Sequence, residues 1–191
     1  LGVKKFALLG TDYVYPRTTN KILKQYLIDK GIPETDIFVN YTPFGHSDWS
    51  KIVGDVVALG ADGKKVGVIS TINGDANIGF YKELAAAGIK ADDIPVVAFS
   101  VGEEELSGLD TKNLVGHLAA WNYFQSAESD LNTKFIKKWK AKMGDKRVTN
   151  DPMEAHVIGF EMYVKAVEKA GSTDVDAVRK AMYGIKVPNL T

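Results

Sequence analysis

The sequence contains no cysteine among its 191 residues. Disulfide bonds, thiolate nucleophiles and zinc sites with sulfur ligands are therefore excluded. No apolar run approaches the roughly 20 residues that a helix needs to cross a bilayer. The 24 basic residues balance the 24 acidic ones, so no overall field attracts nucleic acid or an acidic membrane surface. We expect neither nucleic-acid binding nor membrane insertion.

The sequence signatures of the common enzyme classes are also missing. No HExxH, GxSxG, P-loop or GxGxxG pattern stands where its mechanism needs it. The three histidines, His46, His117 and His156, are far apart, and no nucleophile has an evident base beside it. His117 falls inside an expected strand, where a structural role is commoner than a ligating one. We expect no catalysis, no metal and no cofactor.

The patterns that are present alternate between strand and helix over the first two-thirds of the chain. The expected strands cover residues 4–10, 37–42, 66–70, 95–99 and 115–123. The first helix begins near Thr18 and ends before Gly31, and the second is capped by Ser47 or Asp48. This order predicts an α/β fold built on a doubly wound parallel sheet.

The remainder of the chain, from Asp130, is expected to be purely helical, with three helices. The clearest start signal is Asp151 as a cap, Pro152 as the first helical residue and Glu154 two positions later. Three helices without a sheet must bury their apolar stripes elsewhere, and we favour a partner outside this chain. The chain also starts without a methionine, so we expect it to be part of a longer protein.

Polar and aromatic residues gather where the expected strands end. In open parallel sheets the ligand crevice lies outside the carboxyl ends of the strands. The connections at the opposite ends read as ordinary surface turns. The sequence therefore predicts a binding site at the carboxyl edge, formed by residues 12–17, 44–48, 71–75, 100–105 and 123–126.

The segment after the first strand contains two tyrosines, Tyr13 and Tyr15, between Asp12 and Arg17. These side chains offer hydroxyl, carboxylate and guanidinium groups beside an aromatic wall. The alternative is that the tyrosines plug the end of the sheet while Arg17 pairs with Asp12. Both interpretations stay open on these residues alone.

Two further segments contribute candidate contacts. Asn73 precedes Gly74, which we expect at a positive φ, and a helix whose free N–H groups face the edge. Asp75 either contacts a ligand or caps that helix. Ser100 and Glu103 follow the fourth strand, where three consecutive acids either supply an acceptor or simply open a short helix.

Several stretches together resemble the urea and short-chain-amide substrate-binding proteins of ABC transporters. These belong with the branched-chain amino-acid binding proteins of the type I periplasmic binding fold. The resemblance covers nearly the whole chain, in order. It rests on residues 11–17, 71–77, 99–105, 119–124, 148–155 and 167–183.

The resemblance implies two α/β lobes with the ligand in the cleft between them. Residues 1–122 would form the second lobe, residues 123–126 a hinge crossing, and residues 127–191 a helical return to the first lobe. The opening part of the first lobe would then lie outside this chain, together with the opposite wall of the cleft.

The family's ligand contacts carry over to the same three segments of this chain. The first contact maps onto Tyr13 or Tyr15. Tyr15 is preferred, because the two side chains of an extended segment cannot both point the same way. The other contacts map onto Asn73 or Asp75 and onto Ser100 and Glu103. Acceptors such as a carboxylate or an amide oxygen suit the N–H groups of urea or an amide. A tyrosine hydroxyl or a backbone N–H suits its carbonyl.

We therefore expect a solute-binding protein that takes a small neutral polar ligand, urea or a short-chain amide, to the permease subunits of an ABC importer. Its location would be periplasmic or extracellular. One alternative is a receptor for branched-chain or other amino acids. Another is a cytoplasmic amide-sensing regulator of the same fold, and an enzyme of flavodoxin-like architecture is the least favoured.

Overall fold

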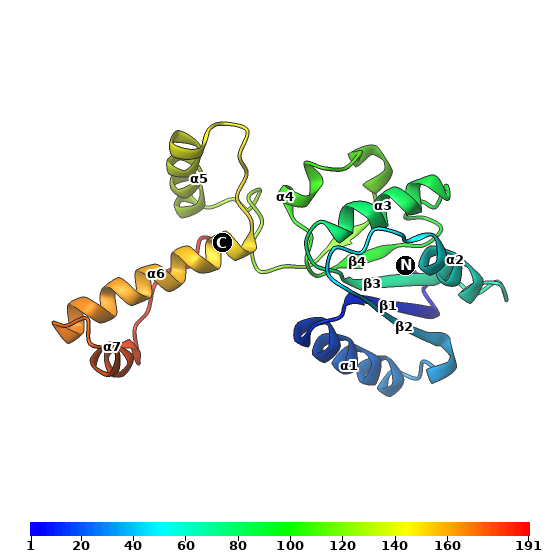
Figure 1. The fold of residues 1–191 in the computed structure, drawn as a ribbon, viewed down its shortest axis with the longest axis horizontal. Helices are drawn as coiled ribbons and strands as arrows, with labels where there is room; N and C mark the ends of the chain where they lie inside the picture. The colour runs from blue at the N-terminus through cyan, green and yellow to red at the C-terminus, as the bar shows by residue number, and fades with distance from the viewer. The chain divides into compact units, whose positions relative to one another are not determined.

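Five parallel strands form one sheet in the order β2-β1-β3-β4-β5. They belong to the first of two compact units, residues 1–121 and 122–191, in a computed structural model that describes all 191 residues (Figure 1). The first strand pairs with both the second and the third, which is the doubly wound order, so the predicted fold class is confirmed. The strands are β1 (Lys5–Thr11), β2 (Ile37–Thr42), β3 (Val66–Thr71), β4 (Val96–Ala98) and β5 (Leu118–Ala119).

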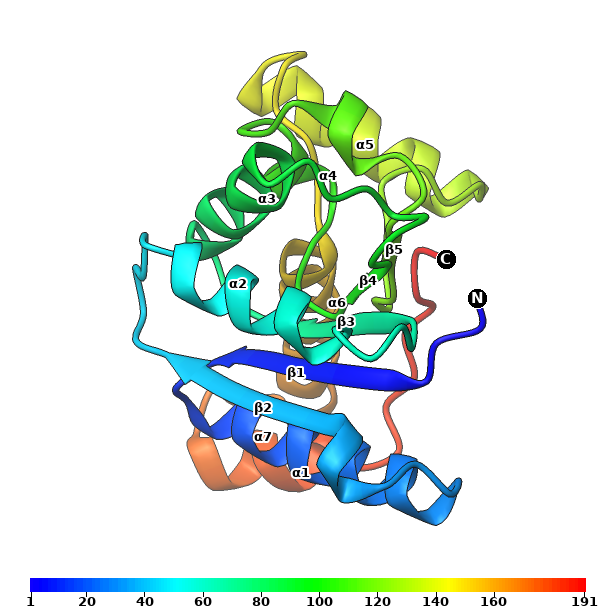
Figure 2. The same ribbon diagram turned by 90° about the vertical axis from the view of Figure 1, so that its right-hand side faces the viewer.

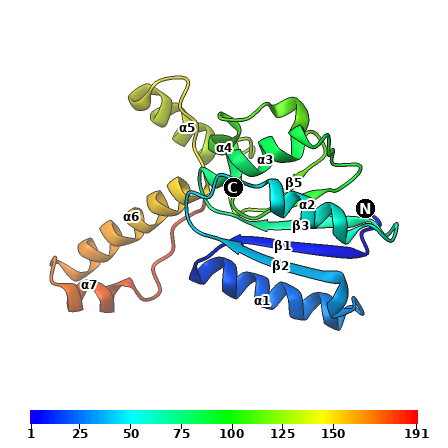
Figure 3. The same ribbon diagram turned by 45° about the vertical axis from the view of Figure 1, so that its right-hand side comes forward.

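Helices cover both faces of the sheet. Figures 2 and 3 show α1 (Val14–Asp29) on one side and α2 (Ser50–Leu59) with α3 (Ala76–Ala86) on the other. The larger core lies under α2 and α3, where Trp49 and Phe80 are almost completely buried. Burial on both faces explains why the central strands β1 and β3 begin as largely apolar runs.

The first helix begins earlier than the sequence predicted, at Val14 instead of near Thr18. Pro16 lies within its first turn, where the missing N–H breaks no helical hydrogen bond. The expected end is confirmed. Gly31 has a φ of +86°, and its N–H and that of Ile32 bond back to the last turn of the helix.

The fifth strand was predicted over residues 115–123 but contains only Leu118 and Ala119. Gly116 has a φ of +95°, which breaks the extended backbone just before it. The imidazole of His117 then accepts the Val96 N–H that a longer strand would pair through its backbone. Two short 3₁₀ helices, η1 (Glu34–Asp36) and η2 (Thr111–Leu114), and the single turn α4 (Glu103–Leu106) complete this unit.

The second unit is built from three helices, α5 (Asp130–Met143), α6 (Asp151–Ala170) and α7 (Val175–Met182). The predicted start of α6 is wrong by one residue. Asn150 is the cap, its Oδ1 accepting the Met153 N–H at 3.1 Å, and Asp151 is the first helical residue. The Asp151 carboxylate instead accepts the backbone N–H groups of Asn122 and Tyr123, at 2.7 and 2.9 Å.

Tyr123 is the centre of a buried polar network in this unit. Its ring is 1% exposed, and its hydroxyl lies 2.7 Å from Asn132 Oδ1 and 2.8 Å from Thr149 Oγ1. The Asn132 amide in turn donates to the carbonyls of Gln125 and Ala127. The hydrogen bonds of Tyr123 and Asn132 thus connect the segment before α5 to α5 itself and to the residues before α6. No helix of the whole chain is long and apolar enough to cross a bilayer.

Charged groups at the amino edge of the sheet form a second network. Lys5 is 9% exposed, and its ammonium donates to the Leu59 carbonyl at 2.8 Å and pairs with Asp62 at 3.0 Å. Asp36, also buried, lies between Lys5 at 3.8 Å and Lys64 at 3.0 Å. The buried charges are therefore paired, as burial requires.

Replacing the buried lysine, Lys5→Met, is expected to lower the free energy of unfolding by about 2 kcal/mol, because the Leu59 carbonyl and Asp62 lose a charged hydrogen-bonding partner and buried Asp36 loses a nearby cation. Urea denaturation followed by circular dichroism measures this change. The matched control is Lys51→Met, which breaks an exposed pair with Asp55 and is expected to cost under about 0.5 kcal/mol. Equal effects of the two substitutions would contradict the role given to Lys5.

Tyr123→Phe is expected to destabilise the second unit by about 1–3 kcal/mol, because the Asn132 and Thr149 side chains lose a buried partner. Hydrogen exchange of the α5 and α6 amides measures the change locally. Tyr26→Phe on the exposed side of α1 is the control and is expected to have no effect on those amides.

Candidate functional site

Buried threonines end the first three strands at the carboxyl edge: Thr11, Thr42 and Thr71. The Thr71 hydroxyl donates toward the Leu9 carbonyl and Asn20 Oδ1, each at 3.2 Å. These bonds join β1, β3 and α1 below the edge. The loops that leave the edge therefore start from fixed positions.

Tyr15 crosses this edge from the first turn of α1 to the end of β4. Its hydroxyl donates to the Phe99 carbonyl and accepts from the Ser100 hydroxyl, both at 3.3 Å. Tyr13 instead packs beside Phe44, with ring centroids 5.5 Å apart, and remains 44% exposed. The two tyrosines diverge, although not in the extended segment that the sequence predicted, because Tyr13 is the cap of α1 and Tyr15 is helical.

Arg17 and Asp12 form an ion pair on the exposed side of the same loop, with 2.5 Å between Nε and Oδ1. The hydrogen bond from Arg17 lowers the pKa of the Asp12 carboxyl below its usual range. The guanidinium also lies 4.6 Å from the centre of the Tyr41 ring. The predicted alternative for Arg17, pairing with Asp12, is thus confirmed.

Asn73 is half-buried between the end of β3 and the start of α3. Its backbone N–H is donated to Thr11 Oγ1 at 2.9 Å, while its side-chain amide nitrogen is buried without a hydrogen-bonding partner. Gly74 has a φ of +63°, as predicted. The end of β3 is therefore followed by a buried amide nitrogen whose N–H groups form no hydrogen bond within the chain.

The predicted alternative for Asp75, that its side chain caps α3, is wrong. Asp75 occupies the cap position with helical angles, φ −61° and ψ −19°, so its carboxylate does not turn back to the free N–H groups. Asn77 orders this turn instead, donating to the carbonyls of Ile72 at 2.8 Å and Gly74 at 3.2 Å. Asn77 was not among the residues predicted for this edge. The Asn-Gly turn that precedes it is the sequence signal that could have pointed to its role.

The segment after β4 turns into α4 at Gly102. Glu105 accepts the Gly102 N–H at 2.8 Å, so the third of the consecutive acids serves the helix. Ser100 is buried beside Tyr15, and Glu103 is half-buried in the first turn. The Trp121 ring lies against Gly102, where an added Cβ would be 3.2 Å from ring carbon Cζ3.

The predicted edge loop of residues 44–48 has a structural role. Asp48 accepts the Ser50 N–H at 3.2 Å, but the cap position of α2 is Trp49, so neither Ser47 nor Asp48 is the cap. The His46 ring meets Trp49 edge-on, with centroids 5.0 Å apart. No group of three or more His, Asp or Glu side chains is placed to hold a metal ion.

The structure brings some of the predicted residues together and separates others. Tyr15 and Ser100 are in direct contact. Asp75 faces a separate hollow of about 170 Å³ between the starts of α3 and α4, lined by Gly74, Asp75, Ile78, Glu104, Glu105, Ser107 and Gly108.

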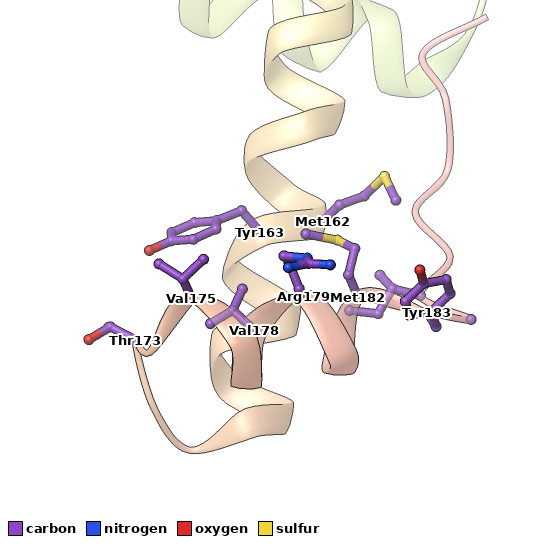
Figure 4. Close-up of a pocket in the computed structure, with 10 residues that line it drawn as sticks. Met162, Tyr163, Thr173, Val175, Val178, Arg179, Met182 and Tyr183 are labelled. Carbon is purple, nitrogen blue, oxygen red and sulfur yellow. The ribbon is translucent and has the colours of Figure 1, made fainter.

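The second unit has a larger hollow, of about 680 Å³, between α6, α7 and the segment after α7 (Figure 4). Apolar side chains such as Met162, Val178 and Met182 line most of it. Its cation, Arg179, pairs with Asp176 at 3.2 Å.

The model of the family described as periplasmic binding protein domain matches residues 1–191. Among solved structures, an ABC transporter solute-binding protein from Rhodopseudomonas palustris BisB5, in complex with 3,4-dihydroxybenzoic acid, is similar with a TM-score of 0.84 and 19% identity. An amino acid ABC transporter substrate-binding protein from Pseudomonas fluorescens Pf-5 has a TM-score of 0.80 and 21% identity. Each comparison covers 99% of this chain but only 50% and 48% of the other protein.

A leucine-, isoleucine-, valine-, threonine- and alanine-binding protein from Brucella ovis is also similar, with a TM-score of 0.74 and 14% identity, over 100% of this chain and 47% of that one. The chain thus spans about half the length of these proteins. The sheet and its helices match a lobe of the type I periplasmic binding fold, which confirms the fold implied by the sequence resemblance.

Proposed function

This chain belongs to the periplasmic binding protein domain family, and we propose that it is part of the solute-binding component of an ABC importer. Residues 1–122 would be the second lobe, residues 123–126 a hinge crossing, and residues 127–191 the helical return to the first lobe. Two observations support this division: the compact units separate between Trp121 and Asn122, and the similar structures are substrate-binding proteins about twice as long.

We propose that the carboxyl edge of the sheet is one wall of the ligand cleft, with urea or a short-chain amide as the ligand. The amide nitrogen of Asn73 carries this proposal, because it is a buried donor without a partner in the chain, which a ligand carbonyl would satisfy. The alternative contacts at Tyr13 and Asp75 would lie further out, since both side chains are more exposed.

The hydroxyl pair of Tyr15 and Ser100, at the end of β4, offers acceptors instead of a donor. The Tyr15 hydrogen is used by the Phe99 carbonyl and the Ser100 hydrogen by the Tyr15 oxygen. The Ser100 oxygen and the second lone pair of the Tyr15 oxygen therefore remain as acceptors for a ligand. With the Glu103 carboxylate they form a set of acceptors. One donor and several acceptors match urea or an amide, which has one carbonyl and several N–H groups.

The charge of the edge argues for a neutral ligand over a carboxylate. Arg17 is the cation of the tyrosine loop, and it is already paired with Asp12 and exposed. An amino acid is the second candidate. It is favoured by two of the similar structures, whose names give amino acids as ligands, whereas a third holds an aromatic acid.

In the proposed mechanism the ligand binds to this wall and then draws the opposite lobe onto it. A ligand that contacts both walls favours the closed state, and the closed form is the one that docks on the permease. Such a protein would act in the periplasm or outside the cell and would not change its ligand chemically.

Asn73→Leu is expected to weaken urea or acetamide binding about tenfold, because the ligand carbonyl loses one hydrogen bond. Calorimetry on the full-length protein with urea, acetamide and leucine measures this. Asn113→Leu is the matched control, since exposed Asn113 lies on η2 at the amino end of β5 and so on the opposite edge. Unchanged affinity in Asn73→Leu would show that the proposed site is wrong. Binding of leucine without binding of urea or acetamide would contradict the proposed ligand.

A further inference from the structure

The side chain of His117 supplies a hydrogen-bond acceptor next to the pairing of β4 with β5. Its Nδ1 accepts the backbone N–H of Val96 at 3.1 Å, immediately before the backbone pairs of β4 with β5 begin at Val97 and Leu118. A nitrogen that accepts an N–H must carry a lone pair, so the ring is neutral with its hydrogen on Nε2. The imidazole thus takes the place of a backbone carbonyl in the ladder.

We propose that His117 is an acid-sensitive latch, whose protonation at Nδ1 turns the acceptor of the Val96 N–H into a second donor and releases β5 from β4. Two donors facing each other cannot bond, and the Val96 N–H is then left without its partner. The remaining backbone pairing of β5 with β4 is short, because β5 contains only two residues.

The surroundings of the ring favour the neutral form. Tyr81 from α3 is the titratable group packed against it, with ring centroids 5.9 Å apart, and β4 contributes the uncharged Val96 N–H. Burial raises the pKa of Tyr81, so its hydroxyl stays neutral, and burial lowers the pKa of His117. The latch therefore holds fully above the ordinary histidine pKa of about 6.5 and is lost as the pH falls through the lowered pKa.

The latch is connected to the candidate site by a short stretch of backbone. After β5, the Ala120 N–H bonds to the Ala98 carbonyl at 2.9 Å. The Trp121 ring then lies against Gly102, whose N–H is held by Glu105 at 2.8 Å. Release of β5 would therefore loosen the packing under the segment that carries Ser100 and Glu103, whichever ligand that segment binds.

Amide hydrogen exchange followed by NMR on the full chain, without ligand, tests the latch. The protection of the Val96 amide, corrected for intrinsic exchange, is expected to fall about tenfold for each pH unit below about 6.5 until the lowered pKa is reached. In His117→Asn the amide oxygen replaces Nδ1 and does not titrate, so this slope is expected to vanish. His156→Asn, which changes the exposed histidine of α6, is expected to keep it.

A second measurement does not depend on any variant. The nitrogen chemical shifts of the wild-type imidazole are expected to show an unprotonated Nδ1 at pH 7.5 and a protonated one when Val96 protection is lost. A proton on Nδ1 at pH 7.5 would overturn the proposal. So would a pH slope of Val96 protection that is the same in the wild type and in His117→Asn. Neither result would bear on the proposed ligand, which calorimetry at neutral pH tests separately.

Discussion

The parallel direction of the strands is the constraint from which the rest of the first unit follows. Because β1, β3 and β4 point the same way, their polar ends meet at a single edge. Parallel strands also require a crossover helix for each return, which brings α1, α2 and α3 onto the two faces. The same geometry that buries the apolar strands thus brings Tyr15, the segment of Asn73 and the end of β4 to one edge of the sheet.

The two edges of this sheet handle their polar groups differently. At the amino edge, Lys5, Asp36 and their neighbours satisfy one another, and such a closed network stabilises the fold without inviting a ligand. At the carboxyl edge the backbone is equally well ordered, yet the Asn73 amide nitrogen has no partner. A buried unpaired donor costs stability, and binding a carbonyl would recover that cost. This contrast is the reason for proposing the carboxyl edge, and not the amino edge, as the binding edge.

The sequence predicted the layers of this fold better than the ends of its elements. The apolar run expected at residues 4–10 located β1 (Lys5–Thr11), because nearly every residue of this central parallel strand is buried. Three of the errors occurred where a side chain makes a hydrogen bond that the sequence pattern does not reveal. The His117 imidazole shortened β5, Asn150 capped α6 one residue early, and Asn77 held the turn assigned to Asp75. Periodicity describes burial, and none of these bonds depends on burial pattern.

For the candidate site, the sequence predicted the edge of the sheet but not which hydroxyl hydrogens are already used in hydrogen bonds within the chain. Tyr15 and Ser100 were both candidates, yet only their mutual bond and the Phe99 carbonyl show that their hydrogens are already used. A carboxylate ligand meeting this pair would place its oxygens against lone pairs, whereas an N–H group would meet acceptors. If the proposed site is correct, the edge would discriminate by the direction of its hydrogen bonds more than by charge, which is the basis for proposing an amide over an acid of similar size.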